Sequence, residues 1–220
     1  MHIISFSCIV VYLLIGRYNT SCKLQAKNML RAATHRKLIA TMDSATQILD
    51  IAERRMRQTG YNAVSYRDIA NEMGIKSASL HYHFPKKEDL GVALTKRYSE
   101  NFSRALQEIA SHEQNAAARI NAFVDIYSTA LKQRRLVCLC AVLGAESEGL
   151  PERVNVEIKS FFDQNIGWLT QQYDDLGKAN PANHAKTALS LLSGAMVISA
   201  SSQDDSIFDA AAQSIFAGLD

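Results

Sequence analysis

Residues 65–90 read SYRDIANEMGIKSASLHYHFPKKEDL, and this stretch decides the fold that the chain is expected to adopt. It predicts a short helix that ends at Gly74, a second short helix over residues 77–83, and a stop at Phe84. Gly74 stands where a tight turn needs a positive φ, which glycine adopts at little cost. Leu80 and Phe84 lie four residues apart, so they share one face of the second helix and can pack on the first. This pattern is the sequence form of a helix-turn-helix.

The other face of the second short helix is suited to the major groove of DNA. Its members are Lys76, Ser77, Ala78, Ser79, His81, Tyr82 and His83. Lysine can donate to guanine, small side chains can contact a thymine methyl group, and tyrosine can bond to the backbone or to a base. Two alternatives stay open for His83, which either faces DNA or packs inward beside Phe84.

A second set of residues is suited to phosphate contacts, which position a protein on DNA without reading its sequence. It comprises Ser65, Tyr66, Arg67, Lys86 and Lys87. Ser65 also fits the N-cap of the first short helix, because Asp68 follows three residues later and can reach back. The free N–H groups and the dipole at that end of the helix favour a phosphate.

The same residues resemble the signature of the TetR family, the tetracycline-repressor-type regulators of bacteria. The similarity rests on residues 68–70 (DIA), 74–75 (GI) and 78–90 (ASLHYHFPKKEDL), and it extends upstream through residues 48–53 (ILDIAE) and 60–61 (GY). The resemblance implies a sequence-specific DNA-binding regulator of transcription, usually a repressor, that a small-molecule ligand or a thiol modification releases from a palindromic operator. The expected partners are therefore double-stranded operator DNA, a second copy of the chain and an unknown small-molecule inducer.

The fold class follows from the periodicity of the whole chain. Apolar residues recur near the helical period, and no clear alternation of polar and apolar side chains indicates a strand. An all-α fold is predicted, with a three-helix DNA-binding domain over residues 43–103 and a helical ligand-binding and dimerisation domain over residues 104–220. Besides the helix-turn-helix, helices are expected at residues 44–59, 87–110, 116–132, 138–146, 151–176, 182–201 and 206–219.

The last two expected helices, 182–201 and 206–219, are predicted to form a homodimer. Small and apolar residues recur there at steps of three and four: Ala185, Ala188, Leu189, Leu192, Ala195, Met196 and Ser199. The alternative is a face buried within one chain. Pairing is favoured because one helix-turn-helix contacts few base pairs, whereas two related by a two-fold axis give a palindromic footprint.

A ligand cavity is expected in the C-terminal domain, with Tyr127, Phe162 and Trp168 as candidate contacts. Residues 138–146 (CLCAVLGAE) resemble a stretch of one TetR branch, which includes the acrylate-utilisation regulator and the repressor of N-ethylmaleimide reductase. In the latter, the cysteine at this position senses electrophiles and oxidants, so the resemblance implies a sensor role for Cys138. A buried core cysteine is the alternative. Cys138 and Cys140 are expected on opposite faces of one helix, where they cannot bridge.

Residues 1–41 are expected to be a disordered or spurious leader, with translation starting near Met42. They contain an apolar run at residues 9–15 that is too short to span a bilayer, and their charged residues are all basic. Two alternatives are a weak membrane anchor built on the apolar run and a basic arm that reaches the minor groove. No stable membrane association is expected.

Nothing in the sequence supports an enzyme. It contains no nucleophile elbow, P-loop, dinucleotide-binding loop or HExxH motif, and no Cys/His cluster at zinc spacing. Neither a cofactor nor a metal is expected, and the competing classes are a membrane-tethered sensor and an uncharacterised helical enzyme. Residues 44–98 are net basic and the chain beyond is acidic, which suits a protein that touches phosphates at one end. The cysteine usage indicates a reducing cytoplasm, and the resemblance to the TetR family implies a bacterial one.

Overall fold

The computed structural model describes residues 44–219 of the 220-residue chain. Residues 47–220 form one compact unit. The predictions made for the leader, its apolar run and its basic arm lie outside the described residues.

Every regular element between residues 44 and 219 is helical, which confirms the all-α prediction. A first helix covers residues 44–59. It is followed by α3 (Tyr66–Met73), α4 (Ser77–His83), α5 (Lys87–His112), α6 (Ala116–Arg134), α7 (Leu139–Ala145), the 3-10 turn η1 (Ser147–Gly149), α8 (Glu152–Asp175), α9 (Pro181–Ser202) and α10 (Ser206–Phe216). The predicted bounds agree to within a few residues, and η1 was not predicted.

Local chemistry explains where several helices begin and end. Gly60 closes the first helix with a φ of +84°, and Gly74 closes α3 with a φ of +67°, so both positions favour glycine. The Asn115 side chain accepts a hydrogen bond of 2.8 Å from the backbone N–H of Ala118 and caps α6. α9 starts with Pro181, whose fixed φ suits the first helical turn.

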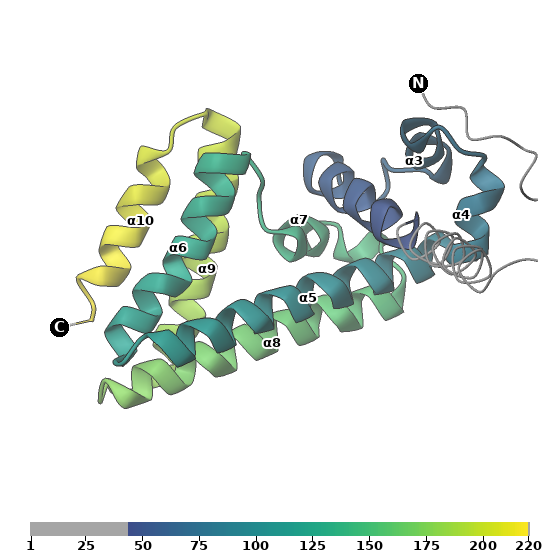
Figure 1. The fold of residues 1–220 in the computed structure, drawn as a ribbon. Coiled ribbons are helices and arrows are strands. Elements are labelled where there is room, and N and C mark those ends of the chain that lie inside the picture. Colours follow the sequence, from purple (N-terminus) through teal and green to yellow (C-terminus); the bar gives the residue numbers. More distant parts are fainter. Residues whose placement is uncertain (1–43, 220) are drawn as a thin grey trace, which may run out of the picture. The chain divides into compact units, whose positions relative to one another are not determined.

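The long helices α5 and α8 lie side by side, and α6, α9 and α10 pack together beyond them (Figure 1). α5 begins directly after the helix-turn-helix and continues into this C-terminal bundle. The predicted boundary between residues 103 and 104 therefore falls inside one continuous helix, and the division into two domains stays a prediction.

One continuous apolar core runs from the first helix to α10. Aromatic rings fill its centre. Phe102 meets Phe123, Tyr127 and Phe161 edge to face, with ring centroids 5.6, 5.9 and 5.3 Å apart. Trp168 stacks on Phe123 at 5.7 Å. Such pairs add about 0.5–1.5 kcal/mol each beyond the burial of apolar area.

The face of α9 that was predicted to form the dimer is part of this core. Its seven members are all buried within one chain: Ala185, Ala188, Leu189, Leu192, Ala195, Met196 and Ser199. They turn inward where α9 packs against α6, α8 and α10. The prediction is wrong for these residues, because a stripe at three- and four-residue steps is equally typical of a helix that packs inside its own chain.

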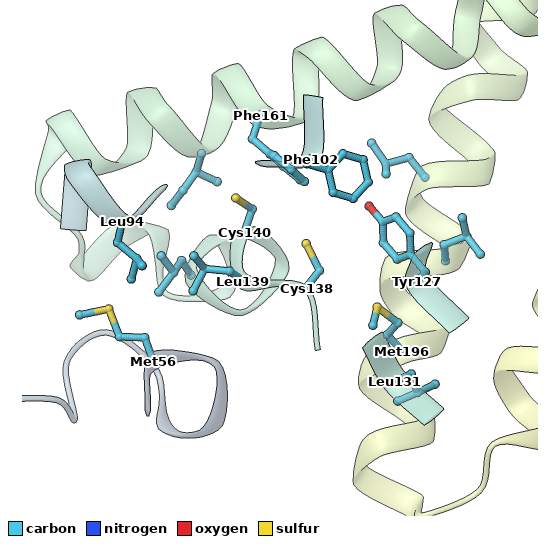
Figure 2. Close-up of a cluster of buried hydrophobic side chains, with 14 of the residues drawn as sticks. Met56, Leu94, Phe102, Tyr127, Leu131, Cys138, Leu139, Cys140, Phe161 and Met196 are labelled. Carbon is cyan, nitrogen blue, oxygen red and sulfur yellow. The ribbon is translucent and has the colours of Figure 1, made fainter. Parts of the chain in front are cut away.

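The two described cysteines also differ from expectation. Cys138 is the N-cap residue of α7 and does not belong to the helix, so the helical argument for opposed thiols does not apply. Cys138 and Cys140 are free and buried in the same core (Figure 2). Burial raises the pKa of both thiols.

Candidate DNA-binding surface

The start of the helix-turn-helix is fixed by a capping box. The Ser65 hydroxyl accepts a hydrogen bond of 3.2 Å from the backbone N–H of Asp68, and the Ser65 N–H donates to the Asp68 carboxylate at 2.9 Å. The Ser65 hydroxyl also donates to the Asp68 carboxylate at 2.5 Å, and this bond and the one from the Ser65 N–H lower the pKa of Asp68. The predicted N-cap is confirmed, and it orients the first turn of α3 at the protein surface.

α4 presents the side chains that were predicted to enter the groove. Leu80 is fully buried on its inner side, and Phe84 packs just beyond its end. On the outer side, Lys76, Ala78, Ser79, His81 and Tyr82 are exposed, and Ser77 is half-buried. Tyr82 is 85% exposed, so most of its ring is available to a binding partner.

The two histidines of α4 are partly held by their neighbours. The His83 ring is half-buried, with its centroid 5.2 Å from that of Tyr82 and 6.5 Å from that of Phe84. The His81 ring lies 4.7 Å from the Tyr66 ring, and its Nδ1 is 3.2 Å from the Pro85 carbonyl oxygen. His81 stays exposed, so it remains a candidate for the groove.

The predicted phosphate contacts separate into two groups. Ser65, Arg67 and Lys86 are exposed around the N-terminal ends of α3 and α5. Lys87 is half-buried: its Nζ donates to the Asn62 carbonyl at 3.3 Å and lies 4.5 Å from the centre of the Tyr61 ring. Burial lowers the pKa of Lys87.

Tyr66 does not fit its predicted role as a phosphate contact. Its ring is buried, and its hydroxyl donates a hydrogen bond of 2.7 Å to the carbonyl oxygen of Phe84. Burial raises the pKa of this hydroxyl above its usual value. Tyr66 therefore joins the start of α3 to the end of α4, and it sets their mutual position from inside the domain.

Replacement of Tyr66 by phenylalanine should lower stability and leave DNA affinity unchanged. The substitution removes the hydroxyl and leaves the Phe84 carbonyl without its donor, which costs about 1–2 kcal/mol. Urea unfolding followed by circular dichroism measures the first effect, and fluorescence anisotropy with labelled duplex measures the second. A loss of DNA affinity at unchanged stability would restore Tyr66 as a phosphate contact.

Two other arginines near this surface are engaged with one carboxylate. Arg55 Nε lies 2.8 Å from Glu72 on α3, and Arg54 pairs with the same side chain. Sequence reasoning predicted neither contact. Both join the first helix to α3, and they leave Arg67, Lys76 and Lys86 as the exposed cations on the outer side of the helix-turn-helix.

The candidate ligand residues lie in or against the C-terminal core. Tyr127 and Cys138 are buried, whereas Phe162 and Trp168 are half-buried. Within residues 44–219, the Tyr127 hydroxyl has no partner at hydrogen-bond geometry although it lies near Ser193. Two surface hollows, of about 500 Å³ between α5 and α8 and about 300 Å³ among α8, α9 and α10, are lined by other residues.

Between residues 44 and 219, no group of three His, Cys, Asp or Glu side chains is placed to hold a metal ion. None of the helices in that part of the chain has both the length and the apolar character needed to cross a bilayer.

Comparison with known proteins identifies the family. The family model described as bacterial regulatory proteins, tetR family, matches residues 48–94. A solved TetR transcriptional regulator from Legionella pneumophila is 30% identical, with a TM-score of 0.76 over 79% of this chain and 96% of that one. The chain belongs to the TetR family. This is a family of regulatory proteins and not of enzymes. The narrower likeness to one TetR branch stays a prediction.

Two curated relatives match part of this TetR protein. The nucleoid occlusion factor SlmA of Marinomonas sp. (strain MWYL1) is 27% identical over 123 residues, which are 56% of this chain and 61% of the relative. The HTH-type transcriptional repressor KstR2 of Rhodococcus jostii (strain RHA1) is 32% identical over 79 residues, or 36% and 39% of the two chains. The chain thus spans less than two thirds of these curated relatives.

Proposed function

We propose that this TetR protein is a transcriptional repressor that binds a palindromic operator as a homodimer. The observation that carries the proposal is the outer side of α4, where polar side chains and the 85% exposed Tyr82 ring stand on a helix anchored by the buried Leu80. A short, rigid helix of this kind can enter the major groove with its side chains directed at base edges. The name of the related repressor supports the sign of the regulation.

The exposed cations are suited to contacts with DNA phosphates, which complement the base contacts proposed for α4. Arg67 lies in the first turn of α3, and Lys86 directly precedes α5. Positions at helix N-termini combine a positive side chain with free backbone N–H groups, which favours phosphates on either side of the groove. α4 would then read the bases, while Arg67 and Lys86 fix its register.

Substitutions on α4 and α3 should weaken DNA binding in different ways. Lys76→Ala and Tyr82→Ala should each reduce affinity for the operator by about 1–3 kcal/mol and relax its sequence preference, because they remove base contacts. Arg67→Ala should weaken specific and nonspecific binding together and reduce the salt slope by about one, because it removes a phosphate contact. The operator is first selected from a random duplex pool, and binding is then titrated at several salt concentrations. Unchanged sequence preference in both α4 variants would contradict the groove assignment.

The dimer face that we propose is the outer side of α9. Val197 and Ile198 are 44% and 55% exposed there, and a Cβ added to Gly194 would meet nothing within 4 Å. An open glycine between exposed apolar side chains suits the close approach of a second helix. We therefore still propose that α9 and α10 form the dimer interface, as predicted from the sequence. The face of α9 that meets the partner copy is the one opposite to the predicted face.

Release from DNA is proposed to follow the binding of a small molecule in the C-terminal bundle. The aromatic centre of the core and the unpartnered Tyr127 hydroxyl support a ligand that offers a ring and one polar group. Modification of Cys138 is the second route, and the burial of its thiol makes it the less favoured one.

A further inference from the structure

The His81 ring on the outer side of α4 is exposed, and yet two contacts within the chain hold it in place. The Tyr66 ring of α3 lies against it, with the ring centroids 4.7 Å apart and the planes tilted by 55°. The Nδ1 atom of His81 lies 3.2 Å from the carbonyl oxygen of Pro85, four residues further along. Tyr66 is itself buried and fixed by its hydrogen bond to Phe84, so it offers His81 a rigid surface.

The contact with Pro85 decides which nitrogen of the His81 ring carries the proton. A carbonyl oxygen can only accept a hydrogen bond, so Nδ1 must be the donor and must be protonated. In the neutral ring the second nitrogen, Nε2, then keeps a free lone pair and acts as an acceptor. The position of one backbone carbonyl thus sets the tautomer of His81.

The Pro85 carbonyl is available to His81 because Pro85 belongs to neither of the helices beside it. α4 ends at its C-cap Phe84, and Lys86 is the N-cap of α5. The carbonyl oxygen of Lys86 already accepts from the backbone N–H of Leu90 inside α5, at 3.3 Å. The carbonyl oxygen of Pro85 precedes this helical ladder and accepts from the His81 ring.

The Nε2 atom of His81 is left for a partner outside the chain. It is the ring nitrogen further from the backbone, and among residues 44–219 it has no hydrogen-bond partner. Ala78 lies three residues earlier on the same face of α4, and it is exposed. Its side chain is a single methyl group, so it leaves room for a base edge beside the His81 ring.

A free acceptor restricts what His81 can bind on DNA. Phosphate oxygens are acceptors too, so a neutral ring with an unprotonated Nε2 cannot form a hydrogen bond to them. The donors in the major groove are the amino groups at N6 of adenine and N4 of cytosine, whereas guanine and thymine present acceptors there. An acceptor at this position therefore distinguishes adenine and cytosine from guanine and thymine on the contacted strand.

We propose that His81 recognises the exocyclic amino group of an adenine or a cytosine in the operator, through an Nε2 that the Pro85 carbonyl keeps unprotonated. The Tyr66 ring and the Pro85 carbonyl orient the His81 ring before the complex forms, so little side-chain freedom is lost on binding. The proposal rests on the proposed function, and it names the chemical group that one residue of α4 selects. It also separates His81 from Lys76, which can only donate and is suited to guanine.

Nuclear magnetic resonance of the ring nitrogens tests the tautomer in the free protein, without DNA. Spectra recorded at pH ~8, above the ordinary pKa of histidine, should show a protonated Nδ1 and an unprotonated Nε2 for His81. His83 is the matched control on the same helix, because within the described residues its ring makes aromatic contacts and no hydrogen bond. It should carry its proton on Nδ1 to a smaller extent. A His81 ring protonated on Nε2 would overturn the proposal.

Base analogues in the operator test the contact itself. An operator selected from a random duplex pool should carry adenine or cytosine at the position where His81→Ala abolishes the sequence preference. An analogue of that base without its amino group should weaken binding of the wild type by about tenfold. His81→Ala should bind both duplexes equally, because the acceptor for the amino group is gone. Lys76→Ala, which removes another proposed base contact, should retain the tenfold difference at this position.

Two further substitutions test the direction of the hydrogen bond. His81→Glu retains an acceptor and should prefer cytosine at this position, whereas His81→Lys offers only donors and should prefer guanine. Unchanged discrimination against the analogue in His81→Ala would overturn the proposal. So would weaker binding of every sequence by His81→Glu together with tighter binding of every sequence by His81→Lys, which is the behaviour of a phosphate contact. A protein that bound no duplex DNA would instead refute the proposed function, and the tautomer measurement would stand separately.

Discussion

Replacement of Ile198 by aspartate is expected to produce a monomer whose operator affinity is lower by about a hundredfold, or about 2.7 kcal/mol. Ile198 is 55% exposed on the outer face of α9, next to Val197 and the open Gly194. In the proposed dimer these apolar surfaces meet around a two-fold axis. The substitution therefore places two carboxylates in the interface, one from each copy. An unpaired buried charge costs several kcal/mol and prevents association. A monomer then retains only one half-site contact.

Sedimentation velocity gives the oligomeric state, and anisotropy with the selected operator gives the affinity. Val156→Asp is the matched control, because Val156 is 54% exposed on α8, which is not one of the two helices of the proposed interface. It introduces the same charge and should leave both the dimer and DNA binding intact. If the Ile198→Asp variant stayed dimeric, the interface would lie elsewhere, and tight operator binding by a monomeric wild type would remove the dimer from the proposal.

The helices could be predicted because residues close together in the sequence determine where each helix begins and ends. Ser65 and Asp68 can satisfy each other only at a helix start, and Gly60 and Gly74 stand where the backbone needs a positive φ. These signals involve residues a few positions apart. The same is true of the exposed side of α4, which follows from the period of Leu80 and its neighbours.

The errors arose where two faces of one element have similar chemistry. A tyrosine beside cations at a helix N-terminus suits a phosphate, and only the packed structure shows Tyr66 donating inward to Phe84. α9 is apolar around most of its circumference, so periodicity could not tell the face buried in the chain from the face around Ile198. The sequence pattern gives the spacing of apolar residues along a helix face. It does not show which other element packs against that face.

Contacts between distant parts of the chain could not be predicted at all. Glu146 looks like an ordinary surface glutamate, and Gly60 like an ordinary helix terminator. The Glu146 carboxylate lies so close to Gly60 that an added Cβ would overlap it, which explains why a carboxylate and a glycine occur at these two positions, but a single sequence does not reveal a pairing across this separation. Such contacts decide how the DNA-binding part is held against the rest of the chain.

The thiols of Cys138 and Cys140 are expected to react with N-ethylmaleimide about a thousandfold more slowly in the native protein than in the unfolded chain at neutral pH. Their side chains are 2% and 0% exposed, and burial raises both pKa values. The thiolate is the nucleophile, and its fraction falls tenfold for each unit by which the pKa rises. Reaction therefore requires local opening of the core around α7.

The reaction is measured by mass spectrometry of the peptides that contain each cysteine, with urea-unfolded protein as the reference. Cys138→Ser and Cys140→Ser identify which thiol governs any release of operator DNA. The pH is kept below about 8.5, because thiols with a raised folded-state pKa stabilise the fold fully below their unfolded pKa and lose that contribution as the pH rises. Fast modification of native Cys138, with operator release that disappears in Cys138→Ser, would make the thiol the trigger. Slow modification in every variant would leave a noncovalent ligand, acting through the core that surrounds α7, as the route to release.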